Sequence, residues 1–389
     1  MKLFISSAEP SGDIIAAEVL NSLKSRLNGY PLHMSGIGGQ YSEKQGLKSL
    51  FPMSDITVHG IVEVLPKVFQ ILKRIRQTAD HIISQNPDLV ITIDAFDFHI
   101  RVVKRLRKKG FTGKVIHLVA PAVWAWGAGR APKLMRYYDA LYCLLPFEPP
   151  YFEKEGFQAL YVGNPVLQRF EKQQPTPHFR HKYGIREEAF VLTILPGSRQ
   201  SEVSRLLDEF LASAQLLLPY VPDIHVAIPT FEQFEGLIAE KCKEYDFPIS
   251  IITQEDKLGC FANTNFAIAA SGTVALELGL FNFPFIIAYK TSPITLWIAK
   301  LIAKVNHICL INILMNKLVV PELIQEKCNA HTIFETALSL IQDKKKVELF
   351  HHDKQQALSM LKAHKESMPD YLTQHLLKEM PPASWQKIT

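Results

Sequence analysis

Two loops in the second half of this sequence combine glycine, hydroxyl and charged residues in a pattern that suits a phosphorylated ligand. The first, "PGSRQSEV" (196–203), follows an apolar run and precedes a helical pattern. Gly197 lets the backbone approach a ligand, the amides of Ser198 and Arg199 face outward at a helix start, and the guanidinium adds charge for a phosphate. Because the lysine of GxxxxGK[ST] is missing, phosphoryl transfer is not expected. The alternative is a capped turn with Glu202 near the helix start.

The other loop, "SGTVALELGL" (271–280), follows the apolar run "NFAIAA". Ser271, Gly272 and Thr273 begin a helix there, and small residues at such a start suit a diphosphate held by backbone amides and the helix dipole. Glu277, one turn further on, could accept a hydrogen bond from ribose hydroxyls, or could be an exposed carboxylate behind an ordinary cap. Two loops suited to anion binding in one half of the chain together indicate a nucleoside diphosphate ligand.

The first half of the chain offers carboxylates instead. In "PDLVITIDAFDFHI" (87–100), Asp94 ends a strand pattern and Asp97 stands where a helix N-cap is expected. Either carboxylate could take a proton from an attacking hydroxyl, and a cap role does not exclude this. His99 and the basic run behind it are expected on the solvated surface of the helix. The opening loop "SAEPSGD" offers four residues that either face the hydroxyls of a ligand or only turn the chain and cap the next helix: Glu9, Ser11, Gly12 and Asp13.

The loop "APAVWAWGAGR" (120–130) holds Trp124 and Trp126, which either pack under the loop or form a platform for a sugar ring or an acyl chain. The 14 histidines show no HExxH spacing, and the five cysteines form no CxxC pair. Neither a metal site nor a disulfide framework is therefore expected, and no cofactor is indicated.

Alternating strand and helix patterns must position these loops. Up to about residue 165 the apolar runs are "KLFISS", "HMSGIGG", "PDLVITID", "GKVIHLVA", "ALYCLL" and "ALYVGN". A polar stretch at 170–185 is typical of a linker, and the alternation then restarts with "AFVLTILP", "DIHVAIPT", "PISIITQ", "NFAIAAS" and "FPFIIAY". This pattern predicts two α/β domains with parallel sheets, in which ligands bind at the carboxyl ends of the strands. No strand is expected after Pro293, and residues 331–380 are expected to be helical.

Composition allows two folded domains, because the chain has 389 residues, 47% of them hydrophobic and 21% charged. The net charge of +5 is compatible with phosphorylated ligands, anionic membranes or nucleic acid. No apolar run is long enough to span a membrane, and the apolar region in the first ten residues is too short for a secretory signal. Both observations favour the cytoplasm. The amphipathic stretches 56–77 and 293–317 either face a core or lie on anionic lipid. In the second case the lipid headgroups would meet Lys67, Lys73, Arg74 and Arg76, or Lys300 and Lys304.

The quoted loops, together with "HGIVEVL", "LPFE" and "VVPELIQ", occur in one order across about residues 3–328 and resemble the lipid-A-disaccharide synthase family of inverting glycosyltransferases. The resemblance implies an α/β GT-B architecture, with two Rossmann-like parallel-sheet domains and a cleft between them. It also implies a metal-independent reaction at the inner face of the bacterial inner membrane, on which the protein would be peripheral. The donor would be UDP-2,3-diacylglucosamine, and the attacking group would be the 6-hydroxyl of 2,3-diacylglucosamine 1-phosphate. The products would be a β-1,6-linked disaccharide 1-phosphate and UDP, with no part for nucleic acid.

The same resemblance assigns roles to residues. Residues 1–168 would bind the acceptor and residues 169–344 the donor, while the helices of about 345–389 would pack on the first domain or form a homodimer. Asp97 is the expected general base, with Asp94 as the second candidate. The acceptor side would comprise Glu9, Ser11, Gly12, Asp13, Trp124 and Trp126. UDP would be held by Gly197, Ser198, Arg199, Glu202, Ser271, Gly272, Thr273, Glu277, Asn312, Glu322 and Gln325.

The sequence departs from the family pattern at four positions. Ser7 replaces a glycine, Phe96 a proline, Asn164 a common histidine, and Gly127 the basic residue that usually follows the second tryptophan. Two alternatives therefore stay open. One is another GT-B enzyme on UDP-sugars, such as a peptidoglycan-type N-acetylglucosaminyl transferase or a UDP-N-acetylglucosamine 2-epimerase. The other is a nucleotide-binding, membrane-associated protein without catalysis.

Overall fold

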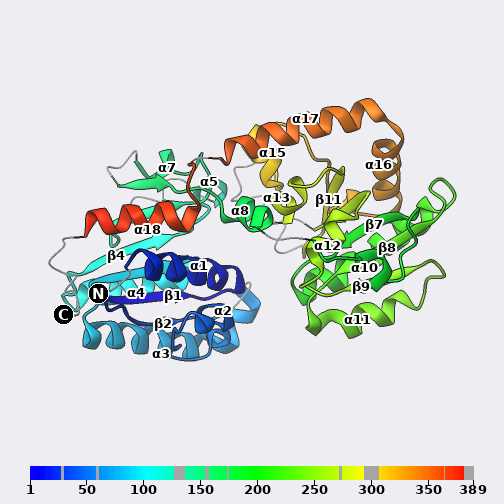
Figure 1. Cartoon of the computed structure of the whole chain (residues 1–389). Helices are drawn as coiled ribbons and strands as arrows, with labels where there is room; N and C mark the ends of the chain where they lie inside the picture. Colours follow the sequence, from blue (N-terminus) through cyan, green and yellow to red (C-terminus); the bar gives the residue numbers. More distant parts are fainter. Residues whose placement is uncertain are drawn as a thin grey trace. The chain divides into compact units, whose positions relative to one another are not determined.

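The chain folds into two compact units (Figure 1). The first comprises Met1–Pro165 and the chain from Lys362 onward, and the second comprises Val166–Leu361. The computed structural model describes residues 1–27, 30–57, 61–126, 136–153, 157–172, 175–270, 274–292, 306–362 and 364–380.

The first unit is built on a six-stranded parallel sheet of order β2-β1-β3-β4-β5-β6. The chain runs outward from β1 to β2 and then returns to the other side of β1 as β3, so the strand order reverses between β1 and β3. Ligands of such sheets bind at this switch point, beyond the carboxyl ends of the strands. The strands are β1 Lys2–Ser7, β2 His33–Ile37, β3 Leu89–Ile93, β4 Lys114–Leu118, β5 Ala140–Cys143 and β6 Ala159–Tyr161.

Helices cover both faces of this sheet, because successive strand residues point to opposite sides. Leu3 and Ile5 pack with α1 and α18, whereas Phe4 packs with α3 and α4. The described helices of the unit are α1 Pro10–Arg26, α2 Gln40–Lys44, η1 Met53–Asp55, α3 Ile61–Gln85, α4 Phe96–Lys108, α5 Val123–Trp126, α7 Pro150–Glu153 and α18 Met368–Glu379.

The last helix closes the first unit. In α18, Met368, Leu372 and Leu376 are fully buried in the cluster that also contains α1. Ser22 Oγ on α1 donates a hydrogen bond of 2.7 Å to Asp370 Oδ1. The preceding helix, α17 (Lys344–Met360), belongs to the second unit, so the chain crosses from one unit to the other a second time just before α18.

The second unit repeats the design with a parallel sheet of order β12-β11-β10-β7-β8-β9. Its strand order reverses between β7 and β10, after which the two predicted phosphate loops begin. The strands are β7 Phe190–Leu195, β8 Ile224–Pro229, β9 Ile249–Ile252, β10 Phe266–Ala269, β11 Phe285–Tyr289 and β12 Glu322–Ile324. The prediction that strands end before Pro293 was wrong, because β12 pairs with β11. β12 has only three residues, too few to show the hydrophobic pattern of a strand.

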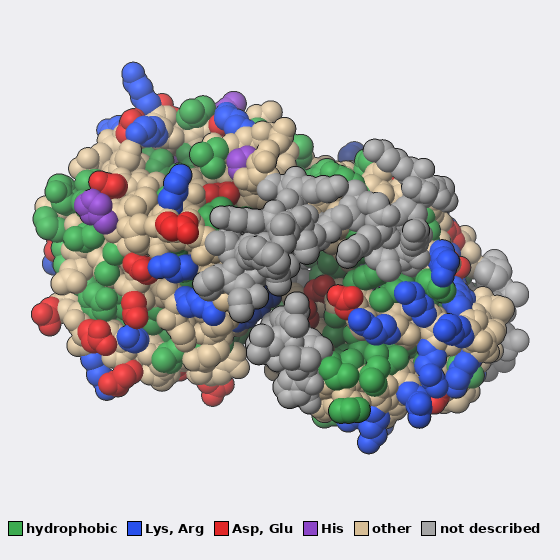
Figure 2. Space-filling model, turned by 180° about the vertical axis from the view of Figure 1, so that it is seen from behind, with side chains coloured by type: hydrophobic (Ala, Val, Ile, Leu, Met, Phe, Trp, Pro, Cys, Tyr) green, Lys and Arg blue, Asp and Glu red, His purple; other side chains and the backbone are tan. Residues whose placement is uncertain are grey.

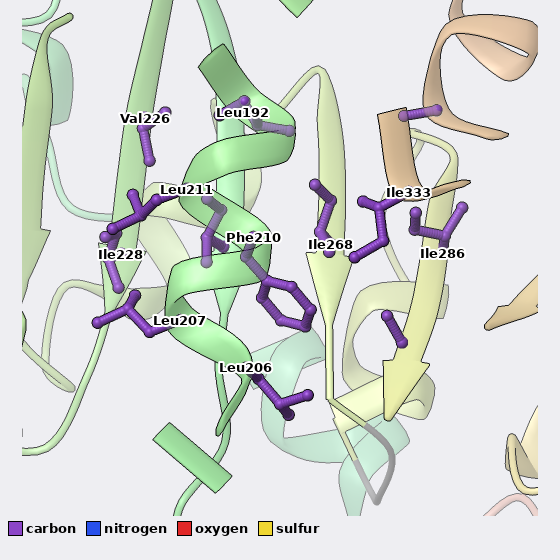
Figure 3. Packing of buried hydrophobic residues seen from close by; sticks show 14 of the residues in the cluster. Leu192, Leu206, Leu207, Phe210, Leu211, Val226, Ile228, Ile268, Ile286 and Ile333 are labelled. Carbon is purple, nitrogen blue, oxygen red and sulfur yellow. The ribbon is translucent and has the colours of Figure 1, made fainter. Parts of the chain in front are cut away.

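Helix α10 (Gln200–Leu217) organises the core of the second unit (Figure 3). Its apolar residues recur every three or four positions, so Leu206, Leu207, Phe210 and Leu211 share the face turned to the sheet. They are 0–2% exposed, and burial of each such side chain stabilises the fold by about 1.5–3 kcal/mol. The other described helices of the unit are α8 Pro165–Lys172, α9 Phe179–Lys182, α11 Glu232–Cys242, α12 Lys257–Ala262, α13 Val274–Gly279, α15 Leu310–Met315, η3 Gln325–Lys327, α16 Ala330–Gln342 and α17.

The described part of the predicted linker is packed on the second unit. Asp256 accepts hydrogen bonds from Thr176 Oγ1 at 2.8 Å and from Tyr183 Oη at 2.6 Å, and it forms an ion pair with Lys182. These contacts lower the pKa of Asp256 to about 2 against the opposing effect of burial. Phe179 is buried beside them. Residues 176–183 are therefore part of the folded unit.

Candidate active site

The opening loop is held against the end of β3. Gly12 is buried, and a Cβ atom on it would lie 3.3 Å from Ser7 Cβ and 3.7 Å from Asp94 Cβ. Glu9, half-buried, is the N-cap of α1, and Ser11 is exposed. The close approach brings two of the predicted functional loops together at the switch point of the first sheet.

Asp13 lies beneath this loop and is only 1% exposed. Its carboxylate accepts hydrogen bonds from the backbone amides of Gly39 at 2.8 Å and Tyr41 at 2.9 Å, and from the amide and hydroxyl of Ser42. It therefore caps the start of α2 instead of its own helix. A contact between Asp13 and the acceptor stays a prediction, and the bonds present give this residue the task of fixing the loop.

The two candidate bases lie in different surroundings. Asp94 and Ala95 have φ angles of 55° and 38°, in the left-handed region, and Asp94 Oδ1 accepts a hydrogen bond of 2.8 Å from the Ala95 amide. Asp97 does not occupy the N-cap position, because α4 already begins at Phe96 and its N-cap is Ala95. Its side chain is 94% exposed, with one carboxylate oxygen 3.7 Å from Arg101. Asp97 thus presents an accessible carboxylate, paired only with the exposed Arg101 among the contacts described.

The loops after β4 and β5 meet at Glu148, the acidic residue of "LPFE". Glu148 Oε2 accepts a hydrogen bond of 3.0 Å from the Leu145 amide, and Oε1 accepts one of 3.3 Å from Trp124 Nε1. Glu148 is 4% exposed, and burial raises its pKa to about 7. The Trp124 ring, half-buried, packs edge-on against Phe147. The side chain of Trp126 and Gly127 lie outside the described residues.

In the second unit, "PGSR" forms the expected sharp turn after β7. Gly197 has a φ of 123°, and a Cβ atom there would lie 2.5 Å from Glu202 Cβ, so glycine is required. Glu202, 8% exposed, accepts hydrogen bonds from the Ser198 amide at 3.0 Å and from the Arg199 guanidinium at 3.3 Å. The carboxylate therefore occupies donors that were predicted to meet a phosphate, and it orients Arg199.

The rest of the predicted nucleotide set is tied to α15 and β12. Asn312 is fully buried; its Nδ2 donates to Glu322 Oε1 at 2.8 Å and its Oδ1 accepts from the Val320 amide at 2.8 Å. Glu322 Oε1 also accepts from the Cys309 amide at 2.9 Å. Gln325, 9% exposed, has a φ of 57°. These groups form a frame at the sheet edge.

The loop after β10 is described only in part. Ser271, Gly272 and Thr273 lie outside the described residues, and α13 begins at Val274. Glu277 forms an ion pair with Lys257 of α12, and both side chains are largely buried. The predicted diphosphate contact of this loop stays a prediction.

Within the described ranges, no group of three or more His, Cys, Asp or Glu side chains is arranged to hold a metal ion. Among the helices of the same ranges, none is long and apolar enough to cross a membrane.

Comparison with protein families identifies the family to which the chain belongs. The family model described as lipid-A-disaccharide synthetase matches residues 3–376. The chain belongs to the lipid-A-disaccharide synthetase family. Membership confirms the resemblance found in the sequence and makes the chain a glycosyltransferase of lipid A biosynthesis.

Individual members of this synthetase family cover most of the chain. A lipid-A-disaccharide synthase of Rhodospirillum centenum is 41% identical over 327 residues, which is 84% of this chain and 81% of that protein. The synthase of Rickettsia typhi is 33% identical and covers 97% of this chain and 99% of its own length. Among solved structures, the UDP-GlcNAc 2-epimerase of Neisseria meningitidis bound to UDP-GlcNAc superimposes with a TM-score of 0.61. It covers 97% of this chain and all of its own at 12% identity, a likeness that shows the fold alone and confirms the GT-B architecture.

The sequence analysis missed two residues near the carboxyl edge of the first sheet. His99 was expected on a solvated surface, but it is 1% exposed, because it shares one face of α4 with the buried Val103 and Leu106. Glu148 received no role, although "LPFE" was one of the motifs. A charged residue in the short loop after an apolar strand was the available signal, since a carboxylate at a sheet edge is either solvated or bonded to neighbouring loops.

Proposed function

We propose that the protein transfers 2,3-diacylglucosamine from its UDP derivative to the 6-hydroxyl of 2,3-diacylglucosamine 1-phosphate. The reaction inverts the anomeric centre, forms a β-1,6-linked disaccharide 1-phosphate and releases UDP. The observation that carries the proposal is the family match over residues 3–376, because it spans the loops of both units. The 2-epimerase alternative loses its support, because the epimerase resembles this chain in fold only.

The donor would bind at the carboxyl edge of the second sheet. Arg199 is 48% exposed, so its guanidinium can turn from Glu202 to a diphosphate. The Ser198 amide can likewise donate to the diphosphate instead of to Glu202. The loop at 271–273 and the carboxylate of Glu277 would complete the nucleotide contacts, with Asn312, Glu322 and Gln325 as the frame behind them. Arginine and helix-start amides stabilise the negative charge that develops on the leaving UDP, so the chain itself supplies the charge stabilisation that the reaction needs.

Asp97 of the first unit would act as general base. Inverting displacement requires the attacking hydroxyl to lose its proton as its bond forms, and an accessible carboxylate can accept that proton. Asp97 is accessible, whereas Asp94 Oδ1 is bonded to the Ala95 amide. The opening loop, with Glu9 and Ser11, and the ring of Trp124 would hold the acceptor beside it.

A membrane surface would supply both acylated substrates, and α3 offers a place for it. Phe69 and Leu72 are 87% and 54% exposed, and the exposed Lys73 and Arg76 follow them on the same helix. Figure 2 shows Lys and Arg side chains gathered around hydrophobic ones on this face of the first unit. Arg74, predicted to meet headgroups, instead pairs with Asp55; Lys300 and Lys304 lie outside the described residues. We propose a peripheral contact with anionic lipid through α3.

The test is an assay of the purified protein with both acylated sugars in detergent, with EDTA present and with product analysis by mass spectrometry. A disaccharide 1-phosphate and UDP in equal amounts support the proposal. Epimerisation of soluble UDP-GlcNAc without any disaccharide would refute it. Asp97→Asn should lower turnover about 10²- to 10⁴-fold with unchanged UDP affinity. Asp80→Asn removes another carboxylate of the first unit, one that is 47% exposed and pairs with Lys109 and Arg105; it should change neither and serves as the control.

A further inference from the structure

One buried imidazole connects the two loops at the switch point of the first sheet. His99 Nε2 lies 2.9 Å from Ser6 Oγ, and His99 Nδ1 lies 2.8 Å from the carbonyl oxygen of Asp94. Ser6 is the second-last residue of β1, directly before the opening loop, and it is fully buried. A single side chain of α4 therefore contacts the end of β1 and the residue that follows β3.

The backbone that His99 contacts is unusual. Asp94 and Ala95 are consecutive non-glycine residues in the left-handed region, a conformation that costs about 1–2 kcal/mol per residue and persists only where surrounding contacts enforce it. The Asp94 amide donates to the Leu118 carbonyl at 3.0 Å, and the Asp94 carbonyl accepts from His99. Both backbone polar groups of Asp94, its N–H and its C=O, are thus hydrogen-bonded. Asp97 follows three residues later.

The bonding pattern also sets the protonation of the imidazole. A carbonyl oxygen only accepts, so His99 Nδ1 carries the proton, and Nε2 is then the acceptor of the Ser6 hydroxyl. The titratable neighbour is His117 of β4, whose ring centre lies 6.2 Å away. Burial lowers the pKa of His99 to about 4, and burial together with the neighbouring His99 holds the pKa of His117 well below its usual value. Burial therefore favours the neutral form of both rings.

From this geometry we propose that His99 is a positioning residue of the transfer reaction. It holds Asp94 in its left-handed conformation relative to Ser6, and through that segment it fixes the opening loop and the start of α4 that carries Asp97. The proposal rests on the proposed function, in which the opening loop binds the acceptor and Asp97 takes its proton.

Kinetics of three variants test the role. His99→Phe keeps a ring but loses both hydrogen bonds, and kcat should fall about 10- to 100-fold, as expected when a catalytic group is misplaced by about 1 Å. UDP affinity should stay within about twofold, because the proposed UDP site belongs to the other unit. Adding Ser6→Ala to His99→Phe should cost nothing more, since coupled residues are not additive. His99→Gln, which can still donate and accept, should recover part of the loss.

Val103→Ala is the matched control, because Val103 is fully buried one turn further along α4. Val103→Ala should lower the melting temperature. At temperatures below the unfolding transition, its kcat should equal that of wild type. The proposal is overturned if folded His99→Phe keeps kcat within about twofold of wild type, if Val103→Ala loses kcat in step with its melting temperature, or if the Ser6 and His99 effects add.

A measurement that needs no turnover tests the geometry itself. In protein labelled with ¹⁵N-histidine, the His99 resonances, assigned by their loss in His99→Phe, should show a neutral ring protonated on Nδ1. A ring protonated on Nε2, or a charged ring near neutral pH, would overturn the proposal. This outcome is distinguishable from failure of the proposed function, which an inactive wild-type enzyme would reveal.

Discussion

Replacement of Glu148 by glutamine should make the first unit more stable above neutral pH. The carboxyl is buried, and its pKa is raised from 4.5 to about 7 by burial, against the hydrogen bonds from the Leu145 amide and Trp124 that favour the charged form. In the unfolded chain the group ionises near its ordinary pKa. The native state therefore binds the proton more tightly, and stability is lost as the pH rises from 4.5 through 7.

The magnitude follows from that pKa change. A rise from 4.5 to about 7 corresponds to about 3 kcal/mol of lost stability at pH 8, of which less than about 1 kcal/mol is present at pH 5. Glutamine removes the charge but also one acceptor oxygen, which costs about 1 kcal/mol at either pH. Glu148→Gln should therefore be about 2 kcal/mol more stable than wild type at pH 8, and no more stable than wild type at pH 5.

The assay is urea unfolding followed by circular dichroism at both pH values, with the transition of the first unit assigned by hydrogen exchange of peptides from β4 and β5. Glu153→Gln is the control, since Glu153 is exposed on the neighbouring α7. An equal loss of stability at both pH values would refute the reasoning, because it would mean that the buried carboxyl keeps an ordinary pKa. Transfer activity should fall in Glu148→Gln if the indole of Trp124 must be held by a carboxylate.

Three further results are expected. Arg199→Ala should weaken UDP binding about 10- to 100-fold in isothermal calorimetry, which corresponds to the loss of one charge-assisted hydrogen bond. Arg205→Ala, which changes an exposed arginine of the helix that follows Arg199, should leave UDP binding unchanged. Wild type should lose about 3 kcal/mol more than His99→Phe between pH 6.5 and pH 4, because the unfolded state takes up the proton first; parallel urea curves would contradict this. Phe69→Ser should reduce flotation with anionic vesicles about tenfold, and Phe231→Ser, which changes a 41% exposed phenylalanine of the second unit, should not.

Much of the scaffold could be predicted from the sequence, because each central strand is buried on both faces and so appears as a short continuous apolar run. The loops between such runs and the following helices were equally visible. The sequence pattern therefore places "PGSR" and "IDAFDF" at sheet edges. Hydrophobic periodicity shows which residues of one helix or strand face the core. This was enough to predict the architecture.

The details of the site depended on contacts between distant residues, which no local pattern contains. Asp13 resembled a cap of its own helix but bonds to residues 39–42. Trp124 and Glu148 meet only because β4 and β5 are adjacent. Two left-handed residues after β3 place the start of α4 at Phe96, so Asp97 is not the cap. A strain that tertiary contacts enforce leaves no mark on local propensity.

The return of the chain to the first unit at α18 has a consequence for how the protein is made. The second unit is continuous in sequence, so it can fold on the ribosome as soon as residues 166–361 have emerged. The first unit begins to form earlier but lacks its last helix until synthesis is almost complete. Until then the cluster that contains Leu20 and Leu23 of α1 lacks Met368, Leu372 and Leu376. Nascent chains are therefore most prone to aggregation in the interval before α18 is released, and a stop codon upstream of Met368 would make that exposure permanent.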